Sequence, residues 1–269
     1  MSCTKNMLIR ILAIITYIGM VAVNALANIL PINGITTGEV SNLYPNLFAP
    51  TGITFAIWGV IYFLLALYSV YQLGFFQKNK TEGLDCLLNK IGVLFSISSI
   101  ANIAWIFSWH YDLIPLTMVL MLVILSCLIL IALEIKKYKL SQNEILFIKL
   151  PFSVYFGWIT VATIANATTL LVYLGWNGFG IGDELWTIII LFVGMIIGVA
   201  TAIKFRCNSY TLVFVWAYTG IFIKHVSSTE LAYQYPTIVT AIIVCITCFL
   251  AAIIYITISK KPRILTEKK

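Results

Sequence analysis

The sequence predicts an all-α fold, a polytopic membrane helical bundle with about eight transmembrane helices. The first observation is composition: 61% of the residues are hydrophobic and only 10% are charged, a balance that soluble domains do not carry. The second is that the apolar residues form long runs, since a bilayer core requires about 20 apolar residues in a helix. The runs span approximately residues 8–30, 51–73, 87–109, 114–135, 146–172, 185–203, 210–224 and 236–258. All but the short run at 210–224 fit a bilayer or come close to it.

The third observation is the placement of the cations. When the chain is threaded through eight crossings, sixteen of its seventeen Lys and Arg residues fall on one side, and only Lys224 falls on the other. Cytoplasmic loops collect Lys and Arg, so this pattern predicts a multi-pass protein of the cell (cytoplasmic) membrane with both termini cytoplasmic. The net charge of +7 then reflects orientation and contact with anionic lipid, and it indicates no nucleic-acid partner.

The first apolar run has two interpretations. Lys5 and Arg10 precede it, and it ends in Ala25-Leu26-Ala27, which resembles a signal-peptidase site. The cation pattern does not separate a cleaved signal from a helix, because the other runs keep their places either way. A length of about two dozen residues favours a transmembrane helix.

The cysteine and small-residue patterns indicate packing. Cys3, Cys86 and Cys207 fall in cytoplasmic segments and the other cysteines inside helices, so no disulfide framework is expected. Gly194, Gly198 and Ala202 form a small-residue row that favours packing within the chain, with a homodimer seam as the alternative.

Polar and aromatic residues recur at helical spacing inside four of the runs, where an amide in hydrocarbon is costly unless it is paired. The four stripes are Tyr17, Asn24 and Asn28; Phe55, Trp58 and Tyr62; Asn102, Trp105 and Trp109; and Tyr155, Trp158, Ala162 and Asn166. One interpretation is hydrogen bonding between helices, worth about 1 kcal/mol per bond. The other is an aromatic pocket for a flat, largely apolar ligand.

The depth of the tryptophans bears on this choice. Trp58, Trp105 and Trp158 lie deeper in their runs than an interfacial belt requires, which favours the pocket. The tryptophans expected in the outer aromatic belt are Trp109, Trp176 and Trp186.

The connection at residues 31–50 also supports a pocket. It is the longest external connection and carries one formal charge, and long loops of this kind are often lids or binding loops. Asn33-Gly34 predicts a tight turn, and Pro50 suits the first turn of the helix that follows.

Three motifs occur in order along the chain. Pro50 opens an aromatic-rich stretch that reaches Trp58 and Tyr62. Asn102-Ile103-Ala104-Trp105 follows in the third run, and Tyr155 and Trp158 precede Asn166 in the fifth. These motifs resemble the second, third and fifth helices of the TspO/MBR family, the tryptophan-rich sensory proteins related to the mitochondrial translocator protein.

The chain departs from that family at several positions. The paired prolines of the family are reduced to Pro50, Ile53 replaces an expected Trp, and Val154 stands where a Pro is expected. The sterol motif of the family requires Lys or Arg soon after a Tyr, but Tyr173 is followed by Leu-Gly-Trp-Asn-Gly, so a cholesterol role is unsupported.

The resemblance implies a five-helix unit at residues 1–176, followed at 177–269 by three additional transmembrane helices and a basic cytoplasmic tail. It implies that the protein binds a small, flat, hydrophobic ligand in the bilayer for sensing, regulation or transport; no cofactor is required, and haem or a porphyrin is the ligand class. The implied ligand-binding residues are Phe55, Trp58, Tyr62, Asn102, Trp105, Tyr155, Trp158 and Asn166. No catalytic residue and no metal site is expected.

Two other classes stay open. A secondary transporter or permease for a small apolar metabolite is the main alternative, although ion-coupled carriers place charges at mid-membrane and no acid falls at the centre of a run. An enzyme is the third class. His110 and His225, the only histidines, are expected on separate outer loops, and no nucleophile motif occurs. Light-driven porphyrin breakdown, which the resemblance also implies, would use Trp rather than acid–base residues.

Overall fold

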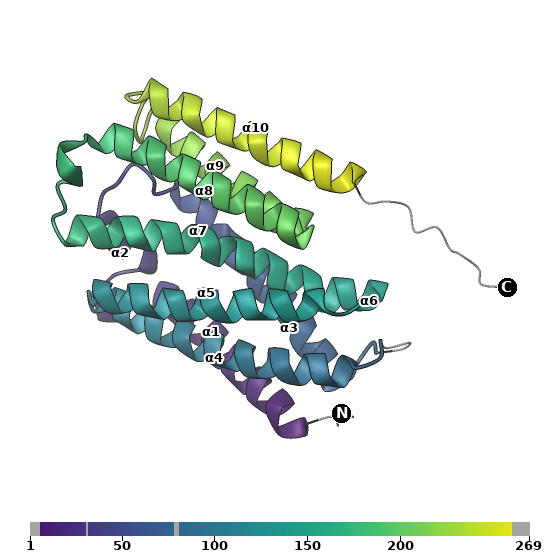
Figure 1. Cartoon of the computed structure of the whole chain (residues 1–269). Coiled ribbons are helices and arrows are strands. Elements are labelled where there is room, and N and C mark those ends of the chain that lie inside the picture. The colour runs from purple at the N-terminus through teal and green to yellow at the C-terminus, as the bar shows by residue number, and fades with distance from the viewer. Residues whose placement is uncertain (1–5, 31, 78–80, 260–269) are drawn as a thin grey trace.

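A computed structural model describes residues 6–30, 32–77 and 81–259 of the protein (Figure 1). Every regular element in these ranges is helical. The long helices are α1 (Met7–Ile29), α3 (Ile57–Leu73), α4 (Leu84–His110), α5 (Ile114–Lys136), α7 (Leu150–Tyr173), α8 (Asp183–Phe205), α9 (Asn208–Val226) and α10 (Pro236–Ile258). The short helices are η1 (Ile32–Gly34), α2 (Thr37–Asn42), η2 (Gly52–Ala56), α6 (Gln142–Glu144), η3 (Ile145–Lys149) and η4 (Gly178–Gly180).

Each apolar run becomes one long helix, so the predicted all-α membrane bundle is confirmed. Among the described residues, seven segments are long and apolar enough to cross a bilayer. The remaining long helix is α9, which has 19 residues and packs against α7, α8 and α10. It buries Tyr210, Thr211 and Tyr218. Because neighbouring helices cover so much of α9, its sequence is less apolar than that of a lipid-facing helix, which explains the short run at 210–224.

Large apolar side chains cover the outside of the bundle. Ile15, Phe63, Val119, Ile196 and Ile254 are each more than half exposed, and they lie on different long helices. Such a surface would be unfavourable in water and is favourable in lipid. The chain is therefore a multi-pass membrane protein.

Five of the long helices form a closed ring. α1 contacts α3, α3 contacts α7, α7 contacts α5, α5 contacts α4, and α4 returns to α1. The helices α8, α9 and α10 form a second group that packs on α7, mainly through α9 (Figure 1). The predicted boundary between residues 176 and 177 falls in the connection between the two groups.

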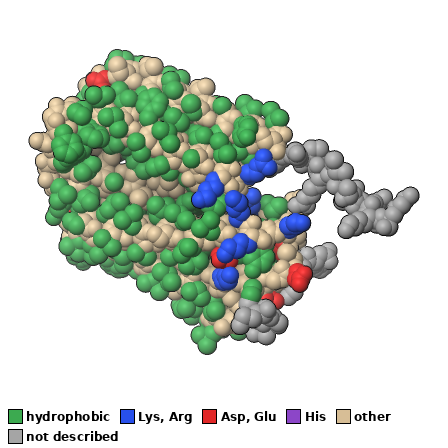
Figure 2. Space-filling model, in the orientation of Figure 1, with side chains coloured by type: hydrophobic (Ala, Val, Ile, Leu, Met, Phe, Trp, Pro, Cys, Tyr) green, Lys and Arg blue, Asp and Glu red, His purple; other side chains and the backbone are tan. Residues whose placement is uncertain are grey.

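The long helices alternate in direction, so the bundle has two ends. At the basic end α1 begins and α10 ends, and at the loop end the segment after α1 crosses the ring (Figure 1). Of the Lys and Arg residues in the described ranges, only Lys224 lies at the loop end. Figure 2 shows Lys and Arg side chains gathered at the basic end, with hydrophobic side chains over most of the remaining face. The start of α1 and the end of α10 thus lie on the same side of the bundle, and the assignment of that side to the cytoplasm stays a prediction.

The start of α4 is tied to its neighbours at the basic end. Arg10 is fully buried; it donates to the carbonyl oxygen of Gln72 at 2.6 Å and forms an ion pair with Asp85 at 2.7 Å. Cys86 is disulfide-bonded. The expectation of no disulfide was therefore wrong. That expectation considered only the redox state of the cytoplasm, whereas disulfide formation also depends on which cysteines lie close together in the fold.

The small-residue row of α8 packs inside the chain. A Cβ atom on Gly194 would lie 2.5 Å from the hydroxyl oxygen of Tyr218. A Cβ atom on Gly198 would lie 2.9 Å from ring atoms of Phe214 and Phe249. Because α9 and α10 occupy this row, the prediction of intramolecular packing is confirmed.

Candidate functional site

Residues 32–50, here called the lid, form a folded cover at the loop end. Asn33 and Gly34 have φ angles of 55° and 82°, so the predicted turn is present in the left-handed conformation that Asn and Gly tolerate. α2 begins with a capping box, in which Thr36 Oγ1 accepts from the backbone of Glu39 and the Glu39 carboxylate accepts from the backbone of Thr36. The bond from the Thr36 backbone is the main reason that the pKa of Glu39 is lowered.

Both histidines hold the lid, contrary to the expectation of separate outer loops. His110 is 2% exposed; its Nδ1 donates to the carbonyl of Ile32 at 3.0 Å, which leaves Nε2 of a neutral ring to accept from the Thr37 hydroxyl at 3.0 Å. His225 is fully buried and donates from Nε2 to the carbonyl of Leu47 at 2.9 Å. α4 therefore holds the beginning of the lid, and α9 holds its end.

A cavity lies beneath the lid, within the loop end of the ring. Its outer part, about 990 Å³, is lined by the lid, α1, α3, α4 and the end of α9 with the segment that follows. Its inner part, about 90 Å³, extends to α5 and α7. The two parts share Phe55, Trp58 and Trp105, so one ligand would contact both; we call them together the loop-end cavity. Its size is within the usual range for small-molecule sites.

All but one of the predicted site residues line this cavity. They are Tyr62 in the outer part, Asn102, Trp158 and Asn166 in the inner part, and Phe55, Trp58 and Trp105 in both. Tyr155 lies behind the wall: it is fully buried, and its ring centre is 6.2 Å from that of Trp58. The structure thus brings residues of three different stripes to one place.

Trp58 is the centre of the aromatic wall. It stacks on Tyr62 with ring centres 5.4 Å apart and meets the edge of Trp158 at 6.2 Å. Phe55 meets Trp158 at 6.0 Å, also edge to face. Aromatic pairs of this kind contribute about 0.5–1.5 kcal/mol each beyond burial, so they hold the wall rigid before any ligand enters.

Trp109 also belongs to the cavity, so its expected place in the outer belt was wrong. It is 5% exposed, stacks on Trp105 with ring centres 5.2 Å apart, and lines the inner part. Its Nε1 donates to the carbonyl of Thr37 in the lid at 3.1 Å. The available signal was helical spacing, since Trp109 is one turn from Trp105 on the same face of α4.

The intramembrane amides join helices as well as lining the cavity. Asn24 Nδ2 donates to Asn102 Oδ1 at 2.7 Å, which links α1 to α4. Asn166 Oδ1 accepts from Trp105 Nε1 at 2.9 Å, and its Nδ2 donates to Thr117 Oγ1 at 2.9 Å, which links α4, α7 and α5. The same side chains therefore join helices and line the cavity.

Three polar atoms around the aromatic wall are buried without a hydrogen-bond partner in the described part of the chain. They are Nε1 of Trp158 and the hydroxyls of Tyr62 and Tyr155. An unpaired buried donor costs about 1–3 kcal/mol. Trp158 and Tyr62 line the cavity, so a ligand acceptor that reached either atom would remove part of this cost.

The second helical group completes the mouth of the cavity, which the sequence motifs did not indicate. Lys224, Glu230 and Leu231 line the outer part. Trp216 Nε1 donates to the carbonyl of Thr54 at 2.9 Å, which ties α9 to η2. The sequence signal for this contribution was Lys224, which lies at the loop end, apart from the other Lys and Arg residues of the described ranges.

Comparison with known proteins decides the family. The family model described as TSPO-like protein matches residues 10–255. The chain belongs to the TSPO-like protein family. The resemblance drawn from the three motifs is thereby confirmed, and the match in this TSPO-like protein continues through α8 and α9 and into α10. No curated protein and no solved structure matches the chain.

Proposed function

We propose that this TSPO-like protein binds a flat, largely apolar ligand of the tetrapyrrole class in the loop-end cavity, and that the bound state serves sensing or regulation. The proposal rests on the surroundings of Trp158. Its ring is part of a packed aromatic wall, and its Nε1 is buried with no partner among the described residues. A flat ligand would contact such a wall over its face and offer an acceptor to that nitrogen.

The polar groups lie at the edges of the cavity, as a flat ligand with polar substituents requires. Lys224 and Glu230 line the mouth, and the Glu230 carboxylate accepts from Thr51 Oγ1 at 2.6 Å. Asn102 lines the inner part, and no described residue accepts a hydrogen bond from its Nδ2. A tetrapyrrole acid would place its carboxylate near Lys224 and its ring on the tryptophans.

The histidines offer no ligand to a haem iron. Both ring nitrogens of His110 are engaged by Ile32 and Thr37 of the lid. His225 donates from Nε2 to the lid, and it does not line either part of the cavity. The lining therefore suits a porphyrin through its ring face, and we expect a metal-free porphyrin to bind as well as haem.

The lining favours binding over passage through the bundle. The inner part of the loop-end cavity reaches Met121 and Ile159. A separate cavity exists at the basic end, and no described residue lines both. A permease opens its cavity to each side in turn, so flux in proteoliposomes tests that alternative, and we expect saturable binding without flux.

The proposal is tested by titrating the purified protein with protoporphyrin and following tryptophan fluorescence. Binding should quench the fluorescence. Trp58→Ala or Trp158→Ala should weaken the affinity for protoporphyrin about tenfold or more, a loss of about 1.4 kcal/mol of binding free energy. Trp158→Phe keeps the ring and removes the N–H, so an intermediate loss would assign the difference to the hydrogen bond.

Trp186→Ala is the matched control. Trp186 lies outside the cavity, where its Nε1 donates to the carbonyl of Gly178 at 2.7 Å. Its replacement should leave affinity nearly unchanged. Equal binding by all the tryptophan variants, or no porphyrin binding by the parent, would show that the aromatic stripes serve packing alone.

A further inference from the structure

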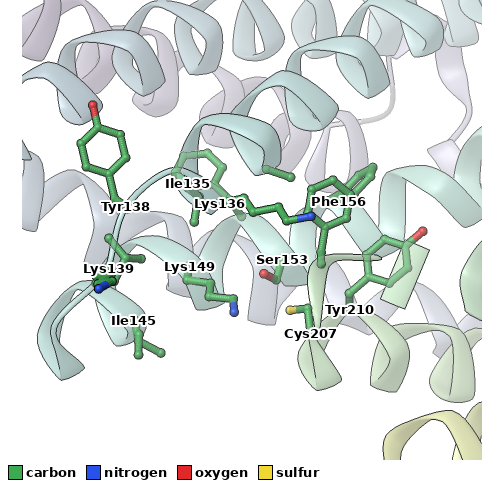
Figure 3. Close-up of a pocket in the computed structure, with 14 residues that line it drawn as sticks. Ile135, Lys136, Tyr138, Lys139, Ile145, Lys149, Ser153, Phe156, Cys207 and Tyr210 are labelled. Carbon is green, nitrogen blue, oxygen red and sulfur yellow. The ribbon is translucent and has the colours of Figure 1, made fainter. Parts of the chain in front are cut away.

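A second cavity, of about 290 Å³, lies at the basic end of the bundle (Figure 3). It is bounded by the end of α5, by η3 with the first turns of α7, and by the junction of α8 and α9. Lys136, Lys139 and Lys149 line it, together with Phe156 and Phe205. We call it the basic-end cavity. It combines positive charge with an aromatic wall.

The lysines of this cavity have no carboxylate partner among the described residues. The nearest acid on α5, Glu134, is paired with Lys90 and Lys137 instead. Lys136 donates to the carbonyl oxygen of Lys204 at 3.1 Å, and its Nζ lies 5.8 Å from the centre of the Phe205 ring. Three cations around one space repel one another, so an anion in that space would stabilise the arrangement.

The polar atoms converge in a manner suited to a compact anion. Lys149 and Ser153 are four residues apart, which places them on one helical face. Figure 3 shows the ammonium group of Lys149 and the hydroxyl of Ser153 turned into the same space, with Lys136 reaching toward it from α5. The Ser153 hydroxyl makes no hydrogen bond with a described residue, so it is available as a donor.

The position of the cavity selects an amphiphile. α5 ends at Lys136 and α8 ends at Phe205, so the lysines lie where membrane helices end and lipid head groups begin. Phe152 and Phe156 of α7 line the deeper part, where the glycerol and upper acyl chain of a lipid would lie. Basic pockets between transmembrane helices at this level bind anionic head groups.

From this charge, shape and depth, we infer that the basic-end cavity binds the phosphate group of an anionic phospholipid. Lys136, Lys149 and Ser153 contact the phosphate, and Phe156 and Phe205 contact the apolar part of the lipid. The inference is independent of the ligand proposed for the loop-end cavity, since no described residue lines both.

The test compares the affinities of the full-length chain for phosphatidylglycerol and phosphatidylcholine by native mass spectrometry. Phosphatidylglycerol should be preferred, and Lys136→Gln with Lys149→Gln should reduce the preference about tenfold or more. Ser153→Leu, which changes no charge and fills the cavity, should reduce it as well. Lys90→Gln with Lys137→Gln removes the same charge from the same end outside the cavity, and it should keep the preference.

Two results would overturn the inference. If the control pair lost as much preference as the cavity pair, the effect would belong to the general charge of the surface. If inorganic phosphate at equal concentration displaced phosphatidylglycerol, the cavity would be a site for a soluble anion rather than a lipid.

Discussion

Trp105 and Asn166 are joined by a hydrogen bond in which the indole Nε1 donates to the amide Oδ1 at 2.9 Å. The bond crosses from α4 to α7, and Asn166 continues it to Thr117 on α5. Both partners line the inner part of the loop-end cavity. The bond therefore fixes the orientation of an aromatic wall and joins three helices of the ring at the same time.

Asn166→Leu should lower the free energy of unfolding by about 1–2 kcal/mol, because it leaves Trp105 Nε1 without an acceptor. Unfolding in mixed micelles, followed by circular dichroism, measures the change. Asn42→Leu, an exposed position on α2, is the control and should have little effect. A double-mutant cycle with Trp105→Phe isolates the bond, and strictly additive effects would show that it contributes nothing.

The lid should depend on the two histidines. His110→Ala or His225→Ala removes a hydrogen bond to a lid carbonyl, worth about 1 kcal/mol, so amide exchange in the lid should rise about fivefold in each variant. Hydrogen–deuterium exchange with mass spectrometry reports this directly. Tyr111→Ala, next to His110 and exposed, should leave the exchange as it is. Unchanged exchange in both histidine variants would mean that packing of Val40 and Phe48 holds the lid.

The basic end should face the cytoplasm. The test labels intact cells with an impermeant maleimide. One cysteine is introduced at Gly182 or at Gln142, in a chain in which Ala replaces the free cysteines Cys127, Cys207, Cys245 and Cys248. The cysteine at 182 should be labelled from outside, and the one at 142 only after permeabilisation. The disulfide of Cys86 favours the opposite orientation, because disulfides persist in oxidising compartments. Labelling at 142 in intact cells would establish that reverse orientation.

A chain that ends at Trp176 should insert into the membrane and bind porphyrin about tenfold more weakly. The truncation removes Lys224 and Glu230 from the mouth, and it removes the contact in which Trp216 donates to the carbonyl of Thr54. Fluorescence titration measures the difference in affinity between the truncated chain and a chain that ends at Ser259. The longer chain keeps all three additional helices. Affinity equal to that of the longer chain would establish residues 1–176 as a self-contained binding unit.

Parts of the site could be predicted from the sequence because helical periodicity is a local property. Trp58 and Tyr62 share a face of one helix at a spacing of four residues, and Tyr155, Trp158 and Asn166 share a face of another. A polar or aromatic stripe within hydrocarbon must face other helices or a cavity. For Trp109 the periodicity was informative, and the estimate of depth was misleading, since distance from a helix end does not reveal that a lid covers that end.

The sequence by itself determined the long helices, their alternating directions and the gathering of the cations at one end, because hydropathy and charge act on each segment separately. Only the tertiary structure decided that His225 holds the lid, that Lys224 lines its cavity, and that Lys136 and Lys149 border a second one. Each of those relationships joins side chains from different helices. They depend on how the helices pack, and no periodicity within a single segment encodes that packing.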